Sequence, residues 1–181
     1  MLTQAEMQKW QNKAVEYLQK ARIVITPAEQ DCIEIADFGL NQFTQIGLAI
    51  LVYVNTDRVC AKELVMLPHQ TCPEHRHPTL GRKTGKEETF RCRWGKMYLY
   101  VPGESGPERH SSLPEGRDTS FTVFHEIVLQ PGDQYTLMPD TLHWFQAGSD
   151  GAVVSEFSTT STDNADIFTD PAINRITKIV K

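Results

Sequence analysis

The stretch His75-Arg76-His77 decides how this chain is expected to fold and where its functional site is expected to lie. Residues two apart in an extended strand point to the same face of a sheet, so the two imidazoles can meet at one point in space. Further along the chain, Glu88 could add a carboxylate and His143 a third imidazole. Three neutral nitrogens and one anionic oxygen suit a divalent first-row metal and leave coordination positions free for water or substrate. These four side chains are the predicted metal ligands.

On both sides of this stretch, apolar residues alternate or run in short segments that are typical of strands. The segments 47–54 and 59–67 flank an Asn-Thr-Asp turn and predict a hairpin. The segment 102–118 is rich in Gly, Pro, Ser and charged residues, which predicts a long loop. Many short strands with frequent turns predict an all-β sandwich or barrel. The further predicted strands are 87–94, 96–101, 121–129, 135–138, 142–146 and 152–157.

The first 40 residues carry helical signals instead. Thr3 and Glu6 have the spacing of a capping box, and apolar residues then recur at helical spacing, which predicts a helix over about residues 4–21. Thr26 and Pro27 repeat the start signal, and Gly39 is the expected end of a second, short helix. The two helices are expected to cover one face or one end of the barrel.

The chain is expected to form one domain over residues 1–181, because this length is enough for one sizeable core. A helical segment at 1–40 would precede the barrel at 44–160. A tail at 161–181 would pack across the outside of the barrel.

The composition is that of a globular protein, with 40% hydrophobic residues, 23% charged residues and a net charge of −5. A nucleic acid or an anionic membrane would need clustered positive charge, so neither is an expected partner. The N-terminus has no basic and apolar signal segment, and no apolar run approaches the ~20 residues that span a bilayer. The four cysteines form no Cys-x-x-Cys pair, which favours free thiols and a cytoplasmic location.

The order of the four predicted ligands resembles the two sequence motifs of the cupin family. In the first motif His75 and His77 precede Glu88, after a longer interval than usual, and Gly95 follows that glutamate at the expected distance. In the second motif a glycine precedes His143 by eleven residues, although the glycine expected after the motif's proline is absent. The resemblance implies an all-β cupin fold, a double-stranded β-helix or jelly-roll barrel, with helices added at the N-terminus.

Longer segments resemble the cupin-type D-lyxose isomerases more specifically, over nearly the whole chain. These segments are 70–78, 85–92, 156–158 and, in the tail, 168–175. The resemblance implies a manganese-dependent interconversion of D-lyxose and D-xylulose, with D-mannose and D-fructose as a second pair. It also implies a homodimer.

Such an isomerase must move hydrogen between C1 and C2 of an open-chain sugar, which needs an open metal site and a base. Glu156 is the predicted base, because it shares a strand face with Val154, and a carboxylate among apolar neighbours is rarely buried unless it is paired or functional. Lys86, two residues before Glu88, is the residue predicted to steady the charge on the oxygens or to carry the hydroxyl proton. The alternatives are an outward-facing Glu156 and a solvated loop Lys86, and Glu87 could replace Glu88 as the ligand.

Three other functions are compatible with the same residues. A cupin sugar-phosphate isomerase would bind phosphate through Arg82, Lys83 and Lys86. An Fe(II) dioxygenase would consume oxygen at the same ligands. A non-enzymatic sugar-binding cupin would need neither the base at Glu156 nor the proton carrier at Lys86.

Overall fold

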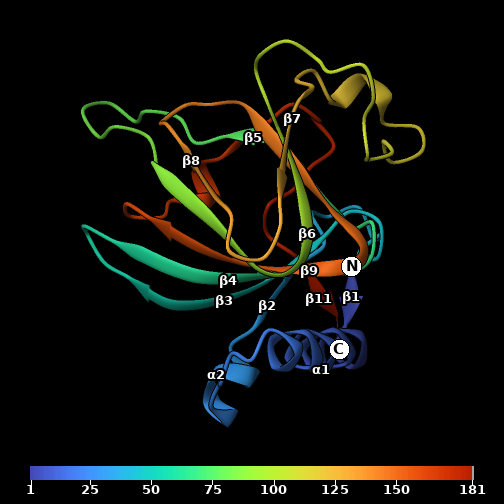
Figure 1. Ribbon diagram of the computed structural model, residues 1–181. Helices are drawn as coiled ribbons and strands as arrows, with labels where there is room; N and C mark the ends of the chain where they lie inside the picture. The colour runs from blue at the N-terminus through green and yellow to red at the C-terminus, as the bar shows by residue number, and fades with distance from the viewer. Residues whose placement is uncertain (181) are drawn as a thin grey trace.

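The computed structural model describes residues 1–180 (Figure 1). In this part of the chain the helices are α1 (Gln4–Lys20) and α2 (Pro27–Asp31), and short 3-10 turns lie at Asp118–Ser120 and Asp163–Ala165. The strands are β1 (Leu2–Thr3), β2 (Glu34–Ala36), β3 (Leu48–Asn55), β4 (Cys60–Met66), β5 (Thr71–Arg76), β6 (Glu88–Val101), β7 (His125–Leu129), β8 (Gln134–Leu137), β9 (His143–Ser158), β10 (Ile167–Phe168) and β11 (Ile179–Val180).

Most of these strands form one sheet that curls around an interior, as Figure 1 shows. Its strand order is β10-β5-β9-β4-β3-β2, and β6 pairs with β9, β7 and β8. The long strand β9 pairs through its first part with β5 and through its second part with β4, while β6 runs along it throughout. One strand therefore carries both His143 and Glu156. The predicted all-β barrel with N-terminal helices is confirmed.

Helix α1 packs on the outer face of the sheet, beside the small parallel pair β1–β11 (Figure 1). The predicted capping box is present, because the Thr3 side chain accepts from the Glu6 backbone N–H and the Glu6 carboxylate accepts from the Thr3 backbone. The helix buries Ala14, Tyr17 and Leu18 against the sheet. A separate apolar core fills the interior of the barrel. Neither described helix has the length and apolar character needed to cross a bilayer.

The second predicted helix is wrong in its length. α2 ends at Asp31, and β2 begins at Glu34 and pairs antiparallel with β3. Ile35 points to the α1 side of the sheet and Ala36 to the barrel interior, so the apolar run buries residues on both faces as a strand does. Gly39 does not end a helix; it lies in the turn after β2 with φ +72°.

Two predicted turns are also wrong, because β6 and β9 each continue through them. Gly95 was expected to separate two strands, yet it lies within β6 and pairs with Ala152. A Cβ at Gly95 would collide with the carbonyl oxygen of Gly151, so the glycine permits close approach of two backbones rather than a turn. The hairpin β3–β4 and the long loop at 102–118 are confirmed.

The predicted strand at 121–129 forms only from residue 125 onward. Phe121 and Val123 instead pack as a loop against Trp144, which is fully buried. The indole Nε1 of Trp144 donates a hydrogen bond to the Val123 carbonyl at 2.7 Å. This contact fixes the loop beside the start of β9, next to His143.

Candidate metal and sugar site

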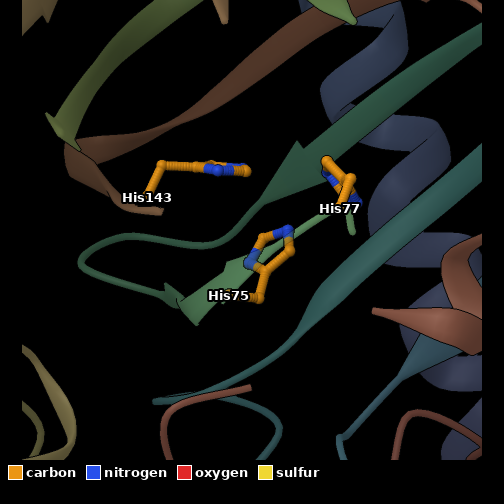
Figure 2. A group of neighbouring side chains, drawn as sticks. All are labelled: His75, His77 and His143. Atoms are coloured by element: carbon orange, nitrogen blue, oxygen red, sulfur yellow. The ribbon is translucent and has the colours of Figure 1, made fainter. Parts of the chain in front are cut away.

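Three histidines converge at one end of the barrel, where β5 and β9 meet (Figure 2). His75 lies on β5 directly across from His143, the first residue of β9. His77 follows the end of β5. One nitrogen from each ring lies within 4.8 Å of the other two, and all three side chains are buried. The structure therefore brings together the three imidazoles that the sequence predicted to meet.

The backbone and one carboxylate orient each ring through Nδ1. His75 Nδ1 lies 2.8 Å from the Pro73 carbonyl, and His143 Nδ1 lies 3.0 Å from the Thr141 carbonyl. His77 Nδ1 lies 2.6 Å from Asp166 Oδ1. With Nδ1 occupied in this way, each ring has Nε2 left for the cavity. His143 Nε2 is buried without a hydrogen-bond partner among the described residues, which is the condition expected of a nitrogen that serves a metal.

Glu88, the first residue of β6, lies beside these nitrogens. Its Oε1 atom is 2.9 Å from His77 Nε2 and 3.3 Å from His143 Nε2. Glu87 is exposed, whereas Glu88 is 2% exposed, so only Glu88 reaches the cavity. Burial alone would raise the pKa of Glu88, but the charges of Lys86 and His77 hold it well below its usual range.

The same electrostatics act on the histidines. Burial lowers the pKa of His75 and brings that of His143 down to about 4, so both rings are neutral at pH 7. Burial also disfavours the charged form of His77, but the neighbouring Glu88 carboxylate outweighs it and raises the pKa of His77 to about 9. A proton on His77 thus balances negative charge in the cavity when no cation is bound there.

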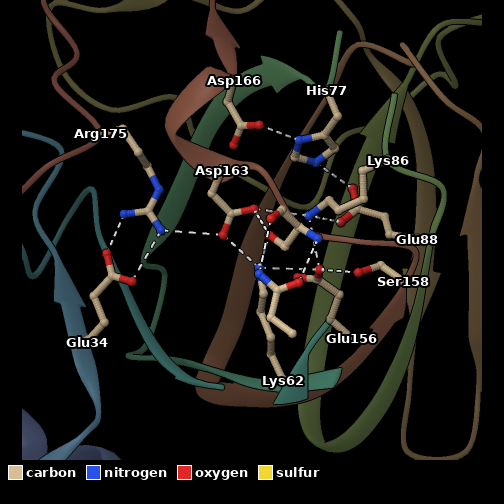
Figure 3. Close-up of polar contacts among 12 residues, drawn as sticks. Glu34, Lys62, His77, Lys86, Glu88, Glu156, Ser158, Asp163, Asp166 and Arg175 are labelled. Atoms are coloured by element: carbon tan, nitrogen blue, oxygen red, sulfur yellow. Dashed lines mark hydrogen bonds and ion pairs between the residues drawn. The ribbon is translucent and has the colours of Figure 1, made fainter. Parts of the chain in front are cut away.

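Lys86 and Glu156 both point into the cavity (Figure 3). Lys86 Nζ lies 2.8 Å from Glu88 Oε2 and 3.0 Å from Glu156 Oε1. Glu156 lies on β9 and is 3% exposed, and Lys86 is 5% exposed. The two alternatives, an outward-facing Glu156 and a solvated Lys86, are therefore wrong. The charged groups of the two predicted catalytic residues are in contact.

Further charged residues complete this group (Figure 3). Lys62 on β4 lies 2.6 Å from Asp163 Oδ2 and 3.6 Å from Glu156 Oε1. Arg175 pairs with Glu34 and lies 3.6 Å from Asp163. Burial would raise the pKa of Asp163, but Lys86 and Lys62 hold it far below its usual range.

Of Lys62, Asp163 and Asp166, only Lys62 stands out in the sequence. Lys62 shares the inward strand face with Cys60 and Leu64, where a lysine is unusual. Asp163 and Asp166 come from the tail, where no periodic pattern marks an inward side. The tail was expected to pack only across the outside; it also supplies side chains to the cavity wall.

The cavity has two chemically different sides. His75, His77 and the charged residues form one side, and phenylalanine rings form the other. Phe168 stacks on His75 with ring centroids 5.4 Å apart, and Phe38 packs against Phe168 at 5.7 Å. Arg82 and Lys83 are exposed and do not line the cavity, so a phosphate pocket built from that loop does not form. The aromatic rings lining the cavity are Phe38, Phe90, Phe145 and Phe168.

The charges around the cavity fit a divalent cation. Four carboxylates line it, and two ammonium groups, from Lys62 and Lys86, face them. Arg175 is balanced separately by Glu34. With His77 neutral, as a metal ligand must be, this leaves an excess of two negative charges in a buried space, where uncompensated charge costs several kcal/mol. When no cation is bound, the proton on His77 offsets one of them. The carboxylates belong to Glu88, Glu156, Asp163 and Asp166.

Comparisons with known proteins show the family to which the chain belongs. The family model described as D-lyxose isomerase matches residues 4–181. The chain is 59% identical over 179 residues to the D-lyxose/D-mannose isomerase of Thermosediminibacter oceani, with 99% of each chain covered. It is 58% identical over 180 residues to the D-lyxose ketol-isomerase of Thermofilum sp., covering 99% of this chain and 100% of that relative.

A solved structure shares the fold at lower identity. The L-ribose isomerase of Cellulomonas parahominis, determined with no ligand, superposes with a TM-score of 0.83 at 20% identity, covering 99% of this chain and 98% of that one. The cupin-type barrel inferred from the sequence is thus the fold of an established sugar isomerase. Because the family model and the close relatives match nearly the full length, the chain belongs to the D-lyxose isomerase family and is an aldose–ketose isomerase.

Proposed function

We propose that this enzyme interconverts D-lyxose and D-xylulose, and D-mannose and D-fructose as a second pair. The names of the two relatives support these substrates, since both name D-lyxose and one also names D-mannose. D-lyxose and D-mannose have the same configuration at C2, C3 and C4, so one cavity can present the reacting carbons of either sugar alike. The observation that carries the proposal is the carboxylate of Glu156, buried in the same cavity as His75, His77 and Glu88, with His143 Nε2 3.3 Å from Glu88.

His75, His77, Glu88 and His143 would hold the metal, for which we propose Mn²⁺. The unpartnered Nε2 of His143 and the excess negative charge of the cavity support a divalent ion. Imidazole and carboxylate ligands are compatible with manganese and with other first-row ions. When bound, such an ion acts as a Lewis acid that polarises the sugar's carbonyl oxygen and stabilises the developing enediolate.

Glu156 would act as the base. Its carboxylate takes the proton from C2 of the open-chain aldose and returns it to C1, while the O2 hydroxyl proton moves to O1. Lys86 would carry that second proton or steady the charge on the oxygens, because its Nζ lies between Glu88 and Glu156. The aromatic side of the cavity would keep bulk water away from the reacting carbons.

A panel of free and phosphorylated sugars tests the proposal. After removal of metal with a chelator and reloading with Mn²⁺, the enzyme should convert D-lyxose and D-mannose and leave the phosphorylated sugars unchanged. Preference for a sugar phosphate would support the alternative isomerase. Oxygen consumption with Fe(II) would support a dioxygenase, and binding without turnover would support a sugar-binding cupin.

We also propose that the enzyme is a homodimer of the cytoplasm. Apolar side chains are exposed on the outer face of strands β3, β4 and β9, in the part that α1 does not cover. They are Tyr53, Val59 (just before β4) and Phe157, which are 41%, 53% and 50% exposed. Such apolar side chains suit an interface between two copies. The four cysteines are unpaired, as a reducing compartment favours. Light scattering on the purified protein would measure twice the chain mass for a dimer, and the chain mass alone would contradict it.

A further inference from the structure

Lys62 is a buried cation that the mechanism above does not use. It lies on β4 directly across from Glu156 on β9, and strand alternation turns it into the barrel while Glu63 faces outward. Its side chain is 3% exposed. Burying an ammonium group is costly, and a buried ion pair adds little net stability compared with well-packed apolar residues. The presence of a lysine here therefore calls for a role other than packing.

Two lysines and a serine hold Glu156 by one oxygen of its carboxylate.

 Lys86 Nζ lies 3.0 Å, Lys62 Nζ 3.6 Å and Ser158 Oγ 3.2 Å from the same atom, Oε1 (Figure 3). Both hydrogen bonds that side chains of residues 1–180 donate to this carboxylate go to Oε1, and none goes to Oε2. One oxygen is therefore held by two cations and a hydroxyl, and the other remains available for chemistry in the cavity.

Lys62 is itself fixed from the opposite side. Its Nζ donates to Asp163 Oδ2 at 2.6 Å and to Ser161 Oγ at 2.9 Å. Both partners lie in the segment that follows β9, and Asn55 anchors this segment through hydrogen bonds with the Ser161 backbone. The ammonium group thus bridges the tail and the β9 carboxylate, and it cannot turn away from Glu156 without losing two hydrogen bonds.

We propose that Lys62 is a positioning residue, which holds Glu156 by Oε1 so that Oε2 faces the reacting carbons, and that Asp163 keeps Lys62 in place. This inference rests on the proposed role of Glu156 as the base. Proton transfer needs the donor carbon and the acceptor oxygen close together and aligned, and a misplacement of about 1 Å can cost on the order of 100-fold in rate. Lys62 does not contact the proposed metal ligands, so its removal should leave metal binding intact.

The substitution Lys62→Met tests this role, because methionine keeps an unbranched stem of similar size and removes the charge. We expect kcat for D-lyxose to fall about 10- to 100-fold, with KM changed much less and the manganese content unchanged. The kinetic isotope effect for sugar deuterated at C2 should rise, since proton abstraction becomes slower. Lys62→Arg, which keeps a cation, should retain more of kcat than Lys62→Met. The matched control is Lys96→Met, at an exposed lysine of β6.

Glu156→Gln separates a failure of this inference from a failure of the proposed base. If Glu156→Gln retains the activity of the parent, the proposed base is wrong. If Glu156→Gln is inactive but Lys62→Met has the kcat and isotope effect of the parent, only the positioning role is wrong. In the Glu156→Gln background, Lys62→Met should cause no further loss, because the two residues act as a unit.

A second variant covers the case in which Lys62→Met does not fold. Asp163→Asn removes the charge that fixes Lys62 but leaves the lysine itself present. It should lower kcat in the same direction by a smaller factor and raise the same isotope effect. A folded Asp163→Asn variant with the kinetics of the parent would overturn the inference in that case.

Discussion

Asp166 Oδ1 lies 2.6 Å from Nδ1 of His77, and this contact joins the tail of the chain to the histidine cluster. It fixes the orientation of the imidazole and leaves Nε2 facing Glu88 and the cavity. A carboxylate that accepts from the far nitrogen of a metal-binding histidine also makes that histidine a better ligand. The tail therefore contributes to the proposed metal site without supplying a ligand to it.

Asp166→Asn should weaken metal binding while leaving the fold intact. Removing such a partner of a histidine ligand typically costs about 10- to 100-fold in metal affinity. Titration of the chelator-stripped protein with Mn²⁺ would measure the change. Asp150→Asn, at an exposed aspartate, is the matched control and should bind as the parent does. Equal affinities for Asp166→Asn and the parent would contradict the role given to Asp166.

Removal of the metal should lower stability as well as activity. The stripped cavity holds an excess of negative charge and an unpartnered His143 Nε2, and both would be relieved by a bound ion. A ligand that binds only the folded state at 100 times its dissociation constant adds about 2.7 kcal/mol to the free energy of unfolding. Thermal unfolding with and without Mn²⁺ measures this gain. His143→Ala should abolish this gain in stability. If Mn²⁺ does not change the midpoint of thermal unfolding of the parent, the result would contradict a metal at this site.

Gly151→Ala should destabilise the protein strongly, because Gly151 lies on β9 where this strand packs closely against Tyr17 of α1. Its φ is +92°, and a Cβ there would lie 2.5 Å from Tyr17 Cε1 and 2.6 Å from the Met66 carbonyl oxygen. Backbone strain of this kind costs about 1–3 kcal/mol before the steric clash is counted. Urea unfolding would measure the loss. Gly106→Ala, in the exposed loop, would make only an ordinary contact, 3.7 Å from the Glu108 carbonyl oxygen, and should change stability by no more than about 0.5 kcal/mol.

Turnover in ²H₂O should place deuterium at C1 of the D-xylulose product. A carboxylate base passes through a protonated state, whose proton can exchange with solvent before it is returned to carbon. Mass spectrometry or proton NMR of the product would detect the label. A hydride shift from C2 to C1 would leave C1 unlabelled, and an unlabelled product would favour that shift over the base mechanism proposed for Glu156.

Much of the barrel and the centre of the site could be predicted from local sequence patterns. The His75-x-His77 spacing and the shared face of Lys86 and Glu88 depend only on strand alternation, and the structure brings these side chains together. The breaks expected at Gly95 and near Gly151 were wrong, because a glycine in a strand can serve close backbone approach as well as a turn.

The rest of the site depends on contacts between distant parts of the chain. Asp163 and Asp166 belong to an irregular tail, and only tertiary packing brings them to Lys62 and His77. No local pattern distinguishes these aspartates from solvated ones. Lys62 could be recognised as unusual, since a lysine occupies an inward position on β4. Its partners depend on how the strands pair, which the local sequence does not show.

The most direct test of the account is the rate of D-lyxose isomerisation by Mn²⁺-loaded Glu156→Gln. Glutamine keeps the size of the side chain and can still contact Lys86, but it cannot accept the proton from C2. The variant should bind manganese like the parent and lose activity by about 100- to 10,000-fold. A Glu156→Gln enzyme that is correctly folded, holds its metal and turns over at the rate of the parent would contradict the central claim.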